Sequence, residues 1–255
     1  MPEQKMEKLL EIMKRLRKDC PWDAEQTHDS LKPYLLEEAY EVLETIDIKN
    51  YDTMARELGD LLLQIVFHSE IASESGQFNF NDVVEKISHK LIERHPHVFG
   101  DKKVNSAEEV QSNWENSKLK SENRRSLLDG IPKSMPALLS AQRIQEKAAS
   151  VGFEWEELAP VFDKVQEEWD EFHEVYKNQD TDKMREEFGD LIFALVNLGR
   201  FLQINAEDAC RQTNSKFIRR FQYIEKNYNN DPVAMKDATL EELDSFWEEA
   251  KKQGI

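Results

Sequence analysis

One arrangement of five acidic residues occurs twice in this chain, and it limits the possible fold more than any other feature. The first set is Glu37, Glu38, Glu41, Glu57 and Asp60, and the second is Glu167, Glu168, Glu171, Glu187 and Asp190. Each member of the second set lies 130 positions after its counterpart, so the two sets share their internal spacing. A pattern repeated in this way predicts two copies of one structural unit.

Each acidic set consists of two fragments with helical spacing, Glu-Glu-x-x-Glu and Glu-x-x-Asp. Residues three or four apart lie on one side of a helix, so the acids of each fragment converge. Polar turns at 47–52 and 178–182 separate the fragments, which predicts two antiparallel helical hairpins. Apolar residues with the same periodicity predict a core-facing stripe in each unit: Leu58, Leu61, Leu62, Ile65 and Val66, then Phe188, Leu191, Ile192, Leu195 and Val196.

The repeat extends beyond the acids. Trp22 matches Trp155, Lys90 and Arg94 match Lys216 and Arg220, and Trp114 and Lys118 match Trp247 and Lys251. Helical periodicity dominates the chain, and no convincing alternating strand segment interrupts it. Glycine and proline residues between positions 129 and 136 break the helical pattern between the copies. We therefore predict an all-α protein with two tandem helical-bundle units, at 1–130 and 131–255.

Charge and composition indicate which binding partners and which cellular compartment this chain can have. The chain has 51 acidic and 34 basic residues, whereas a nucleic-acid-binding surface needs an excess of basic side chains. Residues 1–16 lack the apolar stretch of a signal peptide, and the longest apolar runs are far shorter than the roughly 20 residues of a membrane span. The two cysteines, Cys20 and Cys210, occupy non-equivalent positions and indicate no disulfide framework. We expect a cytoplasmic protein with no membrane or nucleic-acid partner.

Converging carboxylates favour a hard divalent cation such as Mg²⁺, which keeps several waters and often bridges to substrate phosphates. Without a cation the acids would repel one another, and some would be protonated at neutral pH. A single Glu-Glu-x-x-Glu is usually a solvated helix face, but its recurrence with identical spacing favours a metal site. The predicted metal ligands are Glu38, Glu41, Glu57 and Asp60 in the first unit and Glu168, Glu171, Glu187 and Asp190 in the second.

These motifs resemble those of the MazG nucleoside triphosphate pyrophosphohydrolases, in the all-α NTP pyrophosphatase superfamily. Further similar stretches are Cys-Pro-Trp-Asp at 20–23, Gln-Thr at 26–27, Arg-His-Pro-His-Val-Phe at 94–99 and Val-Gly-Phe-x-Trp at 151–155. The resemblance covers essentially the whole chain, including the two-domain length. It implies hydrolysis of NTPs and dNTPs to the monophosphate and pyrophosphate with Mg²⁺ or Mn²⁺, broad base specificity, and a role in nucleotide-pool cleaning or regulation.

The resemblance also implies roles for single residues, with the second unit as the main catalytic unit. Glu168, Glu171, Glu187 and Asp190 would hold the metal, and Glu167 is the candidate for orienting or deprotonating the attacking water. Lys216 and Arg220, with Lys183 and Arg219 as weaker candidates, would contact the triphosphate, and Trp247 would stack on the base. Arg94 and Lys118 could serve the first unit's own site or, across a homodimer, the site of the other unit.

Other enzyme mechanisms are less compatible with the motifs. The chain has no P-loop and no nucleophilic serine or cysteine motif, so direct hydrolysis is the simpler expectation. A di-iron bundle needs Glu-x-x-His on each of two helices, and Glu25 with His28 is not reproduced in the second half. Two alternatives stay open. One is a non-catalytic, metal-binding assembly or regulatory module, and the other is a narrower dUTP or phosphoribosyl-ATP hydrolase.

Overall fold

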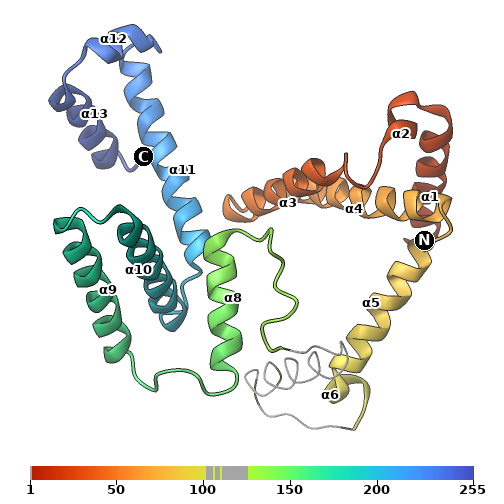
Figure 1. The fold of residues 1–255 in the computed structure, drawn as a ribbon. Helices are drawn as coiled ribbons and strands as arrows, with labels where there is room; N and C mark the ends of the chain where they lie inside the picture. Colours follow the sequence, from red (N-terminus) through yellow and green to blue (C-terminus); the bar gives the residue numbers. More distant parts are fainter. Residues whose placement is uncertain (1, 102–105, 107–109, 111–125) are drawn as a thin grey trace. The chain divides into compact units, whose positions relative to one another are not determined.

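The computed structural model describes residues 2–101, 106, 110 and 126–255 (Figure 1). All regular elements in these ranges are helices, and the chain divides into two compact units, Met1–Asn105 and Ser106–Ile255. The prediction of an all-α protein with two tandem units is confirmed. The domain boundary expected near residue 130 stays a prediction, and this position lies within the second compact unit.

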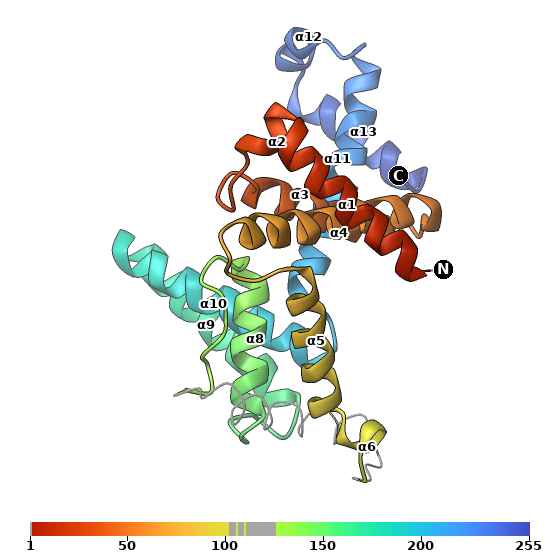
Figure 2. The ribbon, with the colours of Figure 1, turned by 90° about the vertical axis from the view of Figure 1, so that its right-hand side faces the viewer.

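The first unit contains six described helices and one small core (Figures 1 and 2). They are α1 (Pro2–Asp19), α2 (Pro21–Glu25), α3 (Lys32–Asp47), α4 (Tyr51–Glu74), α5 (Phe80–Arg94) and α6 (Pro96–Phe99). Helices α3 and α4 form a hairpin, and α1 packs against α4. Met13, Leu31, Val66 and Phe67 form the buried cluster between α1, the start of α3 and α4.

The second unit repeats the hairpin and adds a helical pair. Its described helices are α8 (Ala137–Ala149), α9 (Ala159–Lys177), α10 (Thr181–Phe201), α11 (Ala206–Asn227), α12 (Pro232–Asp237) and α13 (Leu240–Lys252). Helices α9 and α10 form the hairpin, α8 packs against α10, and α11 pairs with α13. In the ranges that the structure covers, no helix combines the length and the apolar character needed to span a membrane.

The two hairpins have the same turn. Lys49 and Gln179 occupy matching positions, and both have a positive φ, of 54° and 56°, which is uncommon for residues other than glycine. The next residue caps the following helix in both units, because Asn50 accepts from the N–H of Thr53 and Asp180 accepts from the N–H of Lys183, each at 3.2 Å. The turns therefore consist of residues 48–50 and 178–180, shorter than the predicted polar segments.

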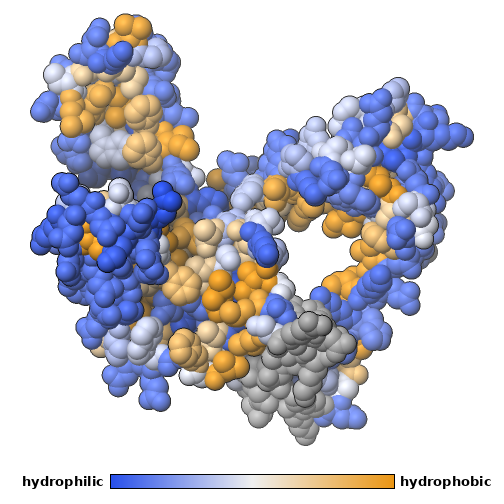
Figure 3. All heavy atoms as spheres, in the orientation of Figure 1, coloured by the Kyte–Doolittle hydropathy of each residue, from blue (hydrophilic) through white to orange (hydrophobic). Residues whose placement is uncertain are grey.

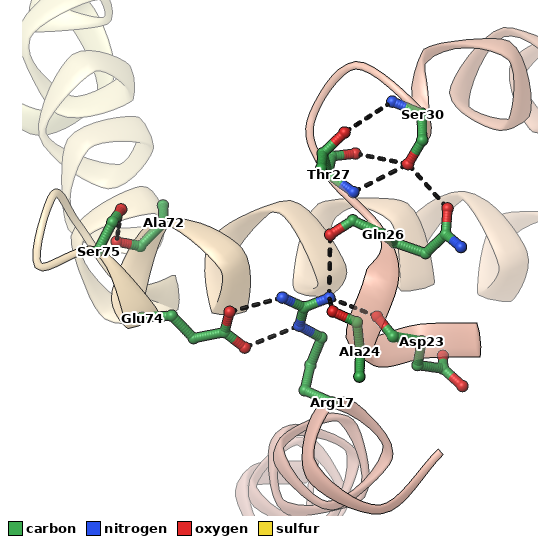
Figure 4. A network of polar contacts seen from close by, with 9 residues as sticks. All are labelled: Arg17, Asp23, Ala24, Gln26, Thr27, Ser30, Ala72, Glu74 and Ser75. Atoms are coloured by element: carbon green, nitrogen blue, oxygen red, sulfur yellow. Dashed lines mark hydrogen bonds and ion pairs between the residues drawn. The ribbon is translucent and has the colours of Figure 1, made fainter. Parts of the chain in front are cut away.

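One guanidinium group fixes the segment between α1 and α3 (Figure 4). The Nε and Nη2 atoms of Arg17 donate to both carboxylate oxygens of Glu74, at 2.7 and 2.6 Å. Its Nη1 atom donates to three main-chain carbonyl oxygens, those of Asp23, Ala24 and Gln26. Only 9% of the Arg17 side chain is exposed, and its bonds join α1, α4 and the α2 segment.

The predicted apolar stripes are only partly buried. Val66 and Val196 are in the interior, but Leu58, Ile65, Phe188 and Leu195 are each exposed over two fifths or more of their surface. The interior face of α4 also includes polar side chains, since Glu57 and Gln64 are buried there. Part of each stripe thus lies at the surface of the unit.

A further group of apolar side chains is exposed on the α11 to α13 region. Figure 3 shows apolar atoms on the surface of this region, at the upper left of the view. Phe217, Ile218, Val233 and Leu240 are each more than half exposed. Contiguous exposed apolar surface of this kind typically marks an interaction site.

Candidate active site

The hairpin of the second unit brings three acids together. Glu168 and Glu171 on α9 and Glu187 on α10 each place a carboxylate oxygen within 4.8 Å of the others, and Glu168 is buried. Burial raises the pKa of Glu187, and the negative charges of Glu171 and Asp190 raise it further. Asp190 is therefore close to the group although it is outside the 4.8 Å cluster. The arrangement favours a bound cation.

The first unit has the matching cluster. Glu38 and Glu41 on α3 and Glu57 on α4 have carboxylate oxygens within 4.8 Å of one another. Burial raises the pKa of Glu38, and the negative charge of Asp60 raises it further. Each hairpin therefore gathers four of its five acids, and their role as metal ligands stays a prediction.

Each cluster also contains a basic residue that the sequence analysis missed. In the second unit, Lys164 Nζ lies 2.7 Å from Glu168 Oε1 and 2.9 Å from Glu167 Oε1. These hydrogen-bonded ion pairs raise the pKa of Lys164 and keep it protonated. In the first unit, Arg56 Nη2 lies 2.7 Å from Glu57 Oε1. The buried acid of each acidic cluster is thus the one that forms an ion pair with a neighbouring basic residue.

The two basic residues are not equivalent in the repeat. Lys164 corresponds to Tyr34, and Arg56 corresponds to Glu186. The ring of Tyr34 instead meets Trp22 edge to face, with 6.0 Å between centroids. The position of Lys164 four residues before Glu168 was a usable signal, because residues with this spacing share a helix face.

Two of the predicted substrate-binding residues lie together between α11 and α13. The guanidinium of Arg220 lies 5.5 Å from the ring centroid of Trp247, and its Nε atom donates to the main-chain oxygen of Ile255 at 2.8 Å. The ring of Trp247 also packs against Phe217, with 5.0 Å between centroids. Trp247 therefore already has aromatic and cationic neighbours in the free protein.

The remaining predicted substrate-binding residues are more scattered. Lys183 is exposed one helical turn before Glu187, and Lys216 and Arg219 are exposed on α11. Arg94 is buried at the end of α5, and Lys118 lies outside the described residues. Across the described part of the second unit, no side-chain hydrogen bond or ion pair joins the acids to the four basic candidates, Lys183, Lys216, Arg219 and Arg220. The roles of all these residues stay predictions.

A cavity of about 740 Å³ lies beside the acidic cluster of the second unit. Helices α8, α9 and α10 and the loop between α8 and α9 form its walls. Lys164, Glu168 and Asp190 line it, together with the aromatic side chains of Phe153, Trp155 and Phe193. Its volume is in the range typical of small-molecule sites. The Val-Gly-Phe-x-Trp stretch at 151–155 was one sequence signal for this cavity, because its last four residues belong to the wall.

Comparison with known proteins identifies the domain in both units. The family model of the MazG nucleotide pyrophosphohydrolase domain matches residues 26–99 and 158–224. The nucleoside triphosphate pyrophosphohydrolase/pyrophosphatase MazG of Thermotoga maritima is 45% identical over 96% of this chain and 95% of its own. The nucleoside triphosphate pyrophosphohydrolase of Escherichia coli strain K12 is also 45% identical, over 98% of each chain. The crystal structure of a mazG-related protein from Thermotoga maritima aligns at 28% identity and a TM-score of 0.40, over 45% of this chain and 99% of that one.

Proposed function

The chain belongs to the MazG nucleotide pyrophosphohydrolase family, and on this basis we propose that it hydrolyses NTPs and dNTPs, ATP among them, to the monophosphate and pyrophosphate. The observation that carries the proposal is the acidic cluster on α9 and α10, with three carboxylates within 4.8 Å, beside a cavity of about 740 Å³. The substrate class follows the names of the two relatives at 45% identity. We expect broad base specificity and a role in cleaning or regulating the nucleotide pool.

Glu168, Glu171, Glu187 and Asp190 would hold Mg²⁺, with Mn²⁺ as a substitute. The donor set fits, because it consists of carboxylate oxygens only, which hard cations prefer. The raised pKa of Glu187 reflects burial and mutual repulsion in the cluster, and a divalent cation relieves that repulsion. The ion, when bound, supplies positive charge to the phosphate oxygens at the α–β anhydride. Glu38, Glu41, Glu57 and Asp60 offer the same set in the first unit.

Two residues on α9 are placed to act on the reacting groups. Glu167 is exposed next to Glu168, and its carboxylate would take the proton of the attacking water. Lys164, which contacts both acids and lines the cavity, would donate to a phosphate oxygen. The water oxygen bonds to one phosphorus of the α–β anhydride as the bond from that phosphorus to the bridging oxygen breaks, and the electron pair leaves with the bridging oxygen on the other phosphate product.

The other basic side chains and Trp247 would contact the substrate from outside the acidic cluster. Lys183, Lys216, Arg219 and Arg220 would bind phosphate oxygens, and Trp247 would stack on the base. Arg94 and Lys118 would act at the first unit's site or, across a homodimer, at the other unit's site. The exposed apolar side chains on α11 to α13 support the homodimer. A cytoplasmic location accords with nucleotide substrates.

We assign the main catalytic activity to the second unit. Its cavity adjoins Glu168 and Asp190, and Asn197 is part of the cavity wall. In the first unit the position matching Asn197 is Phe67, which is buried in the apolar core. The side chain at this position thus faces a cavity in one unit and fills the interior of the other.

Product analysis with a panel of NTPs and dNTPs and Mg²⁺ tests the proposal. The native chain is compared with Glu41→Ala and Glu171→Ala, which remove matching acids from the two units. We expect monophosphate and pyrophosphate, with the loss of activity confined to Glu171→Ala. Loss in both variants would indicate coupled sites. Metal binding without pyrophosphate release from any nucleotide would support the assembly module, and activity on one nucleotide alone would support a narrower hydrolase.

A further inference from the structure

The cavity of the second unit contains a polar group whose hydrogen-bonding capacity is incomplete. Gln145 on α8 is buried in the cavity wall, with 7% of its surface exposed. Its Nε2 atom donates to the main-chain oxygen of Phe193 at 2.8 Å, whereas its Oε1 atom is buried without a hydrogen-bond partner. A buried acceptor without a donor is costly and is usually satisfied by a ligand or by water.

The orientation of the Gln145 amide follows from its neighbour. The Phe193 oxygen is a carbonyl and can only accept, so a flipped amide would bring two oxygens into contact. The atom left without a partner is therefore the oxygen Oε1, which can only accept a hydrogen bond. It would recognise a ligand that presents an N–H group.

The wall also contains the amide of Asn197, in which the oxygen, and not the nitrogen, is already hydrogen-bonded. Asn197 Oδ1 accepts from Arg200 Nε and Nη2 at 3.1 and 3.0 Å, and Arg200 also pairs with Glu154 at 2.5 Å. These bonds occupy the carbonyl of Asn197 and leave its amide nitrogen as the group for a ligand. The cavity thus offers one acceptor and one donor, and the edge of a nucleobase presents groups of both kinds.

Aromatic side chains make the cavity suited to a flat ring. Phe153 is 82% exposed and Trp155 is 42% exposed, although both are large and line the cavity. A base that stacks on them would cover apolar surface that is now in contact with water. Glu168 and Asp190 line the same cavity, so a nucleoside bound here would be next to the proposed phosphate site.

We propose that this cavity binds the nucleoside part of the substrate and that Gln145 Oε1 accepts a hydrogen bond from an N–H group of the base. This placement replaces the stacking of the base on Trp247, because Trp247 does not line the cavity. The inference rests on the proposed function, since it takes a nucleotide as the ligand. It makes Gln145 a specificity-determining residue that contacts the base and takes no part in phosphate chemistry.

The test compares nucleotides that differ in a single N–H donor. Dissociation constants with Mg²⁺ are measured by calorimetry for α,β-methylene analogues of ATP and of purine riboside triphosphate, which lacks the amino group. The analogues of UTP and 3-methyluridine triphosphate form a second pair. We expect the native chain to prefer the donor-bearing member of at least one pair by about tenfold, because a missing donor leaves Oε1 unpaired. In Gln145→Met this preference should fall to about one.

Gln142→Met is the matched control. Gln142 is also on α8 and also has a buried Oε1 atom without a partner, but it does not line the cavity. We expect it to keep the native preference. As a second variant, Trp155→Leu should weaken the binding of both members of a pair alike and leave their ratio unchanged.

The proposal is overturned if the native chain shows no preference in either pair, if Gln145→Met keeps the preference, or if Gln142→Met loses it to the same extent. The hydrolysis of ATP is measured separately. A Gln145-dependent preference without pyrophosphate release would support nucleoside binding here and refute the proposed catalytic function.

Discussion

Replacing Arg17 by methionine should destabilise the first unit, because one buried guanidinium holds together three segments of chain. Methionine has a similar length and preserves the apolar part of the side chain. It removes the paired bonds to Glu74 and the donor that serves three main-chain oxygens. The change thus removes polar contacts and leaves the volume of the side chain almost constant.

The magnitude can be worked from these contacts. The carboxylate of Glu74 is 42% exposed, so solvent screens its ion pair, which contributes about 0–1 kcal/mol. The bonds from Arg17 to the oxygens of Asp23 and Gln26 are partly buried. The Asp23 oxygen keeps the bond from the Gln26 N–H, whereas the Gln26 oxygen loses its donor, which costs about 1–2 kcal/mol. The expected loss of unfolding free energy is therefore about 1–3 kcal/mol.

Urea unfolding followed by far-ultraviolet circular dichroism measures this loss. Arg15→Met is the control, since Arg15 is on the same helix, is 84% exposed and pairs with Asp19 at 3.2 Å on the surface. We expect it to change the unfolding free energy by less than about 0.5 kcal/mol. Similar losses in the two variants would refute the assignment of the stabilisation to the buried contacts.

Three further predictions concern the charges and the helix ends. Lys164→Met should strengthen Mg²⁺ binding to the free protein by several fold, because the ammonium no longer competes for Glu167 and Glu168. The same change should slow turnover. Titration calorimetry measures the first effect and pyrophosphate release the second, and weaker metal binding would contradict the argument. Burial, with the charge of His28 as a smaller cause, lowers the pKa of His68. The contribution of His68 to the unfolding free energy is therefore fully present above about pH 6.5 and is lost as the pH falls. His68→Leu should weaken the pH dependence of the unfolding free energy measured in urea, and an unchanged dependence would exclude His68 as its source. Asn50→Ala and Asp180→Ala should each cost about 1 kcal/mol of unfolding free energy, since each removes a helix N-cap, and a loss in only one would show that the matching turns are not energetically alike.

The hairpins and the gathering of acids could be predicted because both depend on local periodicity. Spacings of three and four residues place Glu38 and Glu41 on one face of α3, and a short polar turn requires the next helix to run antiparallel. These arguments involve neighbours along the chain only. They apply to each copy of the repeat separately.

Which acid is buried, and which basic residue forms an ion pair with it, depends on packing and could not be predicted from local spacing. The buried acid is Glu57 in the first unit and Glu168 in the second, although these are not matching positions. An Arg beside a Glu, or a Lys four residues before one, usually forms an exposed pair of little energetic consequence. Burial of one partner makes Arg56 and Lys164 part of the site, and burial follows from the contacts of whole helices.

Apart from the aromatic stretch at 151–155, the lining of the cavity could not be predicted from the sequence. Gln145 and Asn197 are polar residues in helices with apolar faces, and polar residues at such positions are normally exposed. Their significance depends on which amide atom is already bonded, to Phe193 in one case and to Arg200 in the other. The bond to Phe193 joins α8 to α10, which are far apart in the sequence, whereas the bond to Arg200 lies within α10.

The non-equivalent basic residues restrict how the two halves of the duplication could be recombined. A hybrid hairpin of α3 with α10 would bring Tyr34 and Glu186 to the acids and contain neither basic residue. The opposite hybrid, α9 with α4, would contain both Lys164 and Arg56. Single helices are therefore no longer interchangeable between the copies, and only an exchange of whole hairpins conserves the charge balance around the acids.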